Sequence, residues 1–298
     1  MEQLYDADLI PSAETACAGV LKLTSGERVL IITNPKVEVL SVSQALYAAA
    51  LALGAEPVLL VQPVKTQMDY ADPAVLAALE REPDVVISIS AEKIGKDPEG
   101  LKQPYRHGDR EYDHLFDYLM NGKKLMRSFW SPGMTRDMFK RTVDIDYGRL
   151  KSECSLLVDH FNRAVSMRVS CSGGTDILLG LKGRFGEADD GDFSRPGSGG
   201  NLPAGEAFAS PELETATGTI VFRGSISLYS TDILIKESVT LRLSEGFITS
   251  VEGGAEAAAL RETIALGESK AEAMSAAGSL SRGMGELYRR NARAIGEI

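Results

Sequence analysis

A glutamate in a constrained loop is the first residue of this sequence that could do metal chemistry. Residues 201–211 read NLPAGEAFASP, and Glu206 stands between two prolines, just ahead of a region with a strand pattern. Carboxylate oxygens bind divalent cations, and a ligand that is fixed beforehand loses less entropy on binding. The pattern also fits a surface turn whose acid accepts a hydrogen bond from a nearby amide. Spacing by itself favours this second interpretation.

Further acids lie on either side of this loop. The segment GEADDGD holds four of them: Glu187, Asp189, Asp190 and Asp192. This cluster lacks the twelve-residue spacing of an EF-hand, which ends in a bidentate glutamate, and it is typical of a solvated loop. Glu297, in NARAIGEI, follows an arginine-rich helical pattern, where it is typical of a helix-terminal charge.

Imidazole ligands and catalytic motifs are scarce. The histidines of the sequence are His107, His114 and His160. They form neither HExxH nor another recognised metal spacing, and His160 is typical of a histidine packed between helices. The sequence has no GxSxG elbow, no P-loop and no cysteine with a histidine nearby. No catalytic residue is therefore identified by pattern.

Charge and composition restrict the partners. The sequence has 32 basic and 42 acidic residues, and its net charge of −10 repels phosphate backbones and anionic membranes. The N-terminus carries acids where a signal peptide needs bases, and the apolar runs are too short to span a bilayer. Three cysteines without a CxxC pair indicate reduced thiols. We expect a cytoplasmic protein without a nucleic-acid or membrane partner.

The first half of the sequence must form a parallel sheet. Strand patterns at 26–34, 56–62 and 84–90 alternate with helical patterns at 39–55 and 73–82. Strands joined through helices pair in parallel, by right-handed crossovers. The first strand runs into TNPKVE and not into GxGxxG, so this Rossmann-like layout predicts no dinucleotide or other nucleotide site.

The second half changes to the period of strands. After a long helical pattern at 144–165, runs with a period of two predict a mainly antiparallel, β-rich α+β domain. Residues 183–205 read as a long loop, and the residues after 255 as one or two helices. We expect two domains, a Rossmann-like α/β domain at 1–145 and a β-rich domain at 146–298.

Several separated stretches together resemble the aminopeptidase T family of metallo-aminopeptidases. In chain order they are GERVLIITNP, SPGMT, GGTDILLGLKGR, NLPAGEAFASPE, EGFITSVEGGAEAAAL and NARAIGEI. The resemblance spans nearly the whole chain, and the NLPAGE block is its most specific element.

This resemblance implies a metal-dependent aminopeptidase, a hydrolase that releases N-terminal residues from peptides. Glu206 and Glu297 match the two glutamate ligands of the family, whose metal is commonly zinc or cobalt and whose members are commonly homodimers. In such a site the divalent ion would polarise the scissile carbonyl and lower the pKa of a bound water.

One departure from the family keeps two alternatives open. The remaining family ligands, among them both histidines, follow the block that holds Glu297, and the sequence ends at Ile298. We therefore expect the second domain to be incomplete at its C-terminus. A ring-cleaving enzyme, 2,5-dihydroxypyridine dioxygenase, is similar to the same family and would use Fe(II). A non-catalytic protein of the same fold would need no complete ligand set. The glutamate of the NLPAGE block favours the peptidase.

Overall fold

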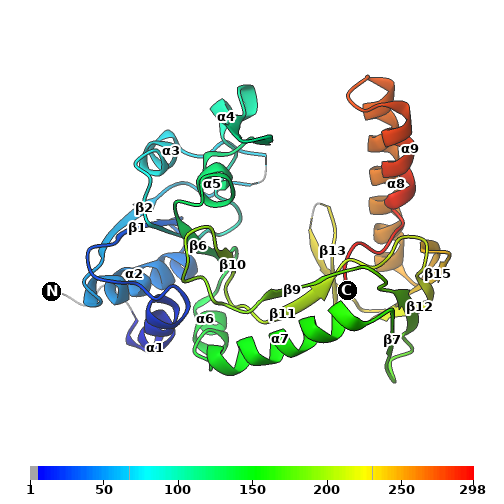
Figure 1. Ribbon diagram of the computed structural model, residues 1–298, viewed down its shortest axis with the longest axis horizontal. Coiled ribbons are helices and arrows are strands. Elements are labelled where there is room, and N and C mark those ends of the chain that lie inside the picture. The colour runs from blue at the N-terminus through cyan, green and yellow to red at the C-terminus, as the bar shows by residue number, and fades with distance from the viewer. Residues whose placement is uncertain (1–5, 67, 230) are drawn as a thin grey trace. The chain divides into compact units, whose positions relative to one another are not determined.

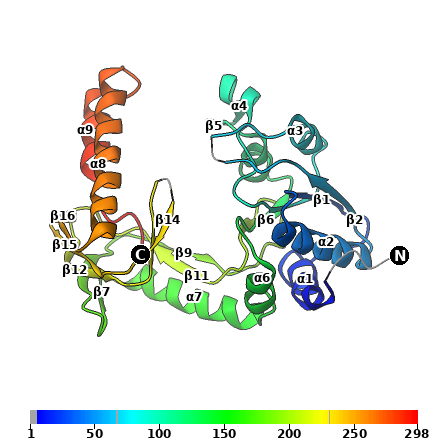
Figure 2. The same cartoon turned by 180° about the vertical axis from the view of Figure 1, so that it is seen from behind.

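The chain divides into two compact units. The computed structural model describes residues 6–66, 68–229 and 231–298 (Figures 1 and 2). The first unit comprises Met1–Cys154 and Ala188–Glu206, and the second comprises Ser155–Glu187 and Ala207–Ile298. Each unit has a hydrophobic core of its own.

The first unit is built on a five-stranded sheet in the order β10-β6-β3-β1-β2, with all pairs parallel. Its strands are β1 (Arg28–Thr33), β2 (Glu56–Val61), β3 (Val85–Ile89), β6 (Arg127–Trp130) and β10 (Gly199–Asn201). The order reverses between β1 and β3, because the chain goes from β1 outward to β2 and then back across β1. The parallel α/β layout expected from the sequence is confirmed.

Helices cover both faces of this sheet, as the strand sequences require. All five residues of β3 are buried, which is typical of a strand in a parallel sheet. Successive side chains point to opposite faces. Ile87 joins the cluster that contains Leu46 of α2 (Val37–Ala52), and Val86 joins the cluster that contains Leu115 of α5 (Leu115–Asp117). Figure 1 shows α2 and α5 on opposite sides of the sheet.

Strand β10 comes from a segment that the sequence predicts to be a loop. Residues 183–205 also contribute β9 (Gly186–Asp189), so the expectation of a structureless loop is wrong. Two glycines allow β10 to pack closely against its neighbours. A Cβ on Gly199 would lie 2.5 Å from the backbone oxygen of Ser128, and one on Gly200 would lie 2.7 Å from Phe193. The domain boundary expected at residue 145 does not include this return of the chain, because residues 188–206 belong to the first unit.

The second unit is a five-stranded antiparallel sheet in the order β16-β15-β12-β8-β7. Its strands are β7 (Ser166–Ser170), β8 (Asp176–Gly180), β12 (Thr217–Phe222), β15 (Val239–Ser244) and β16 (Phe247–Glu252). Valine and leucine alternate with exposed or half-buried residues along β15, so one face of the sheet is apolar. The expected β-rich α+β class is confirmed.

Helix α8 (Ala255–Ala276) packs on the apolar face of this sheet. Its buried residues Ala257 and Ile264 join the cluster that contains Leu241 of β15. Helix α9 (Arg282–Asn291) folds back along α8, and Figures 1 and 2 both show the two side by side. The chain then returns to the sheet, where the Ile248 amide donates to the Arg293 carbonyl oxygen at 2.9 Å.

The remaining elements are short, apart from α7. They are η1 (Ala7–Leu9), α1 (Ile10–Glu14), η2 (Thr15–Val20), α3 (Pro73–Leu79), α4 (Pro98–Lys102), β4 (Tyr105–His107), β5 (Arg110–Tyr112), η3 (Tyr118–Gly122), α6 (Arg136–Thr142), α7 (Tyr147–Arg163), β11 (Glu206–Ala209), β13 (Ser225–Ser227) and β14 (Asp232–Leu234). Over the described part of the chain, no helix is both long enough and apolar enough to cross a membrane.

Candidate functional site

Two acids of the first unit lie on paired strands. Asp189 ends β9 and Glu206 begins β11, and these two strands form a small sheet of their own. The backbone amide of Gly205, the residue before Glu206, donates to the backbone oxygen of Asp189 at 2.9 Å. This pairing brings the acid of the NLPAGE block and one acid of the GEADDGD cluster into the same ribbon.

Asp189 is not the solvated loop acid that the sequence indicates. Its Oδ1 atom is buried and has no hydrogen-bond partner among the described residues. Burial raises the pKa of this carboxyl to about 6, the negative charges of Glu206 and Asp190 also raise it, and the backbone amide of Asn201 opposes the shift. A buried acceptor without a partner is uncommon in a folded protein and points to a ligand or a proton as its natural partner.

Tyr147 holds a second buried oxygen without a partner in the described chain. It is the first residue of α7, and a Cβ on Gly191 would lie only 2.5 Å from its ring. Burial raises the pKa of the Tyr147 hydroxyl, and the charge of Asp189 raises it further. The hydroxyl therefore stays protonated at neutral pH and can donate a hydrogen bond.

Both predicted metal ligands are exposed. Glu206 begins β11 in the first unit, and Glu297 precedes Ile298 in the second. Ile298 and Ala209 exchange two backbone hydrogen bonds of 2.9 and 3.0 Å, the pattern of an antiparallel pair, so Glu297 stands opposite Ser210. The assignment of Glu206 and Glu297 to one metal ion stays a prediction, because the two acids belong to different units.

The histidines do not complete a metal centre. The Nδ1 of His114 accepts from the Phe116 amide at 3.0 Å, and its Nε2 lies 3.0 Å from the Gly95 carbonyl oxygen. His107 and His160 are exposed, so the expectation that His160 packs between helices is wrong. Among the residues that the structure describes, no three His, Cys, Asp or Glu side chains are placed to hold a metal ion.

No local sequence pattern marks Asp189 or Tyr147 as a functional candidate. An acid-rich and glycine-rich segment is usually solvated, and no local pattern marks one of its carboxylates for burial. The available signal was the glycines at 191 and 200, since a Cβ on Gly200 would lie 2.8 Å from Asp189 Oδ1. Such close approaches become visible only when the segment is packed against its neighbours.

The fold of this chain is shared with two solved structures. The structure of 2,5-dihydroxypyridine dioxygenase from Pseudomonas putida KT2440 is similar with a TM-score of 0.60 and 20% identity, covering 86% of this chain and 71% of that chain. Wild-type AmpT from Thermus thermophilus is similar with a TM-score of 0.59 and 16% identity, covering 97% of this chain and 77% of that chain. At these identities the likeness shows the shared fold alone.

Sequence comparison distinguishes between the two. The family model of NicX, 2,5-dihydroxypyridine 5,6-dioxygenase, matches residues 136–280. A curated 2,5-dihydroxypyridine 5,6-dioxygenase of Pseudomonas putida strain KT2440 is 30% identical over 100 residues, which are 34% of this chain and 29% of that protein. The matched stretch thus spans less than a third of the curated relative's length.

These matches overturn the aminopeptidase prediction. The family model and the curated relative both name a dioxygenase, which is an oxidoreductase, so the hydrolase, peptidase and protease assignments are wrong. The resemblance to aminopeptidase T holds for the scaffold that both kinds of enzyme share. The motifs that carried it are partly structural: Leu202 of the NLPAGE block is buried, and Gly205 has a φ of 134°.

Proposed function

We propose that this chain works as a metal-dependent dioxygenase that opens a dihydroxylated pyridine ring. The match of the 2,5-dihydroxypyridine 5,6-dioxygenase family model to residues 136–280 carries the proposal. The curated relative supports the same chemistry over a shorter stretch. A small heteroaromatic ring thus replaces the peptide as the substrate.

Iron is the metal that we propose. Ferrous iron held by histidines and a carboxylate supplies the one-electron chemistry that dioxygen needs to react with an aromatic ring. The described residues offer carboxylates for such a centre, Glu206 and Glu297, but they do not assemble its histidines.

Asp189 and Tyr147 are the groups that we propose for holding the ring. The buried Asp189 Oδ1 can accept a hydrogen bond from a ring hydroxyl, and the buried Tyr147 hydroxyl can donate one to a ring oxygen or nitrogen. Each of these bonds would satisfy an oxygen that lacks a partner in the described chain, which makes the wrong ring costly to bind. We also propose that the protein is a cytoplasmic homodimer without nucleic-acid or membrane partners.

Oxygen uptake tests this function. The chain is loaded anaerobically with ferrous iron and mixed with 2,5-dihydroxypyridine in aerated buffer, while dissolved oxygen and ring absorbance are followed together. We expect equimolar loss of oxygen and ring, because a dioxygenase places both oxygen atoms in its product. The matched control is 2-hydroxypyridine, which lacks the second hydroxyl and should not react. Ring loss without oxygen uptake, or no reaction of the iron-loaded chain, would contradict the proposal.

A further inference from the structure

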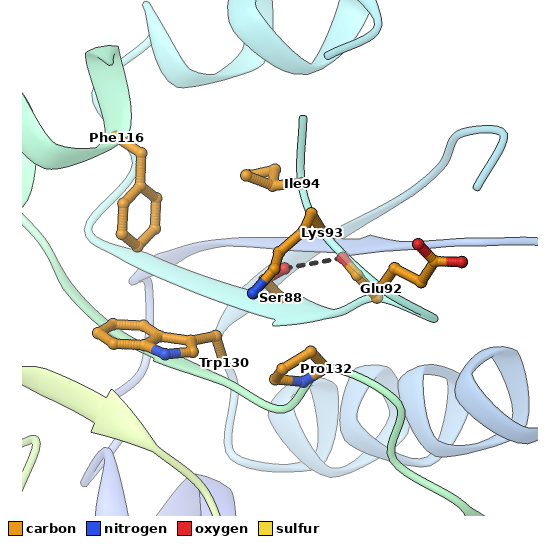
Figure 3. Close-up of a pocket in the computed structure, with 8 residues that line it drawn as sticks. Ser88, Glu92, Lys93, Ile94, Phe116, Trp130 and Pro132 are labelled. Carbon is orange, nitrogen blue, oxygen red and sulfur yellow. Dashed lines mark hydrogen bonds between the residues drawn. The ribbon is translucent and has the colours of Figure 1, made fainter. Parts of the chain in front are cut away.

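A small cavity opens at the carboxyl edge of the parallel sheet in the first unit. Its volume is about 130 Å³, and Ser88 and Ser90 at the end of β3 line it together with Trp130 at the end of β6 (Figure 3). Ligands of open α/β sheets bind outside the carboxyl ends of the strands, close to the point where the strand order reverses. This cavity lies one strand away from that point, which here falls between β1 and β3.

The walls of the cavity suit one planar ring. Phe116 and Trp130 meet edge to face, with ring centroids 6.0 Å apart and an interplanar angle of 81°. Ile94 and Pro132 add further apolar surface. An engineered apolar cavity of about 150 Å³ accepts benzene, so about 130 Å³ of space open to solvent accommodates a single six-membered ring. Aromatic rings also bind well against the edge or face of other rings.

The polar groups of the cavity suit an anionic substituent. The hydroxyls of Ser88 and Ser90 are buried and lie 3.0 Å apart, so whichever donates to the other leaves the second O–H for a ligand. Figure 3 shows the amino group of Lys93 turned toward Ser88 and the carboxylate of Glu92 turned away. Within the described part of the chain, Lys93 forms no salt bridge, in contrast to Lys102 on α4, whose amino group pairs with Glu99 at 2.9 Å.

We propose that this cavity binds a monocyclic aromatic carboxylate. The ring lies between Phe116, Trp130 and Pro132, and the carboxylate faces the Lys93 amino group and the serine hydroxyls. The ring contacts the apolar walls and the carboxylate contacts the polar groups. A neutral aromatic ring or a non-aromatic acid should therefore bind more weakly than an aromatic carboxylate. The proposal is independent of the proposed dioxygenase activity, because the lining residues lie between Ser88 and Pro132, outside the matched residues 136–280, and include neither Asp189 nor Tyr147.

The sole tryptophan of the chain reports on this cavity. Since Trp130 is that residue, its fluorescence, excited at a wavelength where benzoate does not absorb, can be titrated with benzoate. Two matched probes separate the parts of the ligand: benzyl alcohol keeps the ring without the charge, and cyclohexanecarboxylate keeps the charge without the aromatic ring. We expect a saturable change with benzoate and affinities at least about tenfold weaker for both other probes.

Substitution of Lys93 tests the charge contact. Lys93→Met keeps the length and the apolar stem of an exposed side chain, so folding should be unaffected. We expect it to weaken benzoate binding about tenfold or more and to leave benzyl alcohol binding unchanged. Lys102→Met, which removes a lysine outside the cavity, is the control and should bind benzoate like the parent.

Three results would overturn the inference. The first is the absence of a saturable fluorescence change with benzoate. The second is equal affinity for benzoate and benzyl alcohol, which would remove the anionic part. The third is unaltered benzoate affinity in Lys93→Met. Oxygen uptake with dihydroxypyridine is not a readout of these titrations, so failure here leaves the dioxygenase proposal standing.

Discussion

Asp189 and Tyr147 each keep a buried oxygen atom without a hydrogen-bond partner in the described chain. Leaving a buried polar atom unpaired costs about 1–3 kcal/mol, so the fold maintains both oxygens at the expense of stability. Sites that bind ligands commonly hold such groups, since the ligand completes the missing bonds. Asp189 and Tyr147 are therefore the side chains whose substitution should affect ligand binding most directly.

The raised pKa of Asp189 predicts a pH-dependent stability. Its folded pKa of about 6 lies above the value of 3.8 for an exposed aspartate, so the folded chain binds more protons between about pH 4 and 6. The protonated Asp189 carboxyl therefore stabilises the fold below this pH range, relative to the ionised form, and this stabilisation is lost as the pH rises through the range. From pH 4 to pH 8, the free energy of unfolding of the parent should therefore fall by about 1–2 kcal/mol relative to that of Asp189→Asn, less than the full pKa difference gives, because solvent screens this half-buried carboxylate.

Urea unfolding followed by Trp130 fluorescence measures this shift in the unit that holds both residues. Asp232→Asn, at an exposed position of β14, is the control and should show the parent's pH dependence. A constant difference between Asp189→Asn and the parent across the pH range would contradict the burial of this carboxyl.

Glu206 and Glu297 are predicted to retain metal without supporting the fold. Both side chains are exposed, so Glu206→Gln and Glu297→Gln should each change the free energy of unfolding by less than about 0.5 kcal/mol. Each should lower the iron retained after dialysis, measured by elemental analysis, because an amide is a weaker ligand than a carboxylate. Glu245→Gln, an exposed glutamate of a turn, is the matched control. Parent-like iron content in both variants would remove these acids from the site.

At the scale of elements, β10 is the strand whose place depends most on residue size. Gly199 lies so close to Ser128 of β6 that a side chain would meet the backbone oxygen at 2.5 Å. Gly199→Ala should therefore displace β10 and destabilise the first unit by roughly 1–3 kcal/mol. Hydrogen exchange should accelerate at the Ser128 amide, which donates to the Ser198 carbonyl oxygen at 3.1 Å.

Gly224→Ala is the control for this substitution. No heavy atom lies within 4 Å of a Cβ built at Gly224, and its backbone does not have a positive φ. It should leave exchange at Ser128 and the unfolding of the first unit unchanged. Equal behaviour of the two variants would mean that β10 is not held in the sheet by close backbone contact.

At the scale of the whole molecule, the two units have separate cores. The sheet of the first unit is buried between two clusters, and the sheet of the second packs with α8 in a third. We predict two calorimetric unfolding transitions, of which Trp130 fluorescence follows only the one that belongs to the first unit. Leu179→Ala, fully buried in β8, should lower the other transition, since such a truncation costs about 2–5 kcal/mol.

A matched truncation in the first unit completes this test. Leu79→Ala, also fully buried, should lower the transition that Trp130 follows and leave the other in place. A Trp130 transition that moves with Leu179→Ala as it does with Leu79→Ala would contradict separate unfolding.

The fold class of both units is encoded in local sequence patterns. Buried apolar runs such as residues 84–90 specify strands covered on both faces, and the alternation along residues 239–244 specifies a sheet with one apolar face. The resemblance in motifs determined the scaffold as well, and the shared fold confirms it. These features are readable because periodicity and local backbone preference act over a few neighbouring residues.

The conformation of residues 183–205, in contrast, depends on long-range packing. Its composition is that of a solvated loop, and yet packing makes residues 199–201 a strand of the first sheet and buries the Oδ1 atom of Asp189 close to Gly200. The cavity at Trp130 likewise joins residues from β3, α5 and β6 that no sequence spacing connects. Burial and proximity depend on contacts between distant parts of the chain, and the pattern of neighbouring residues carries no record of them.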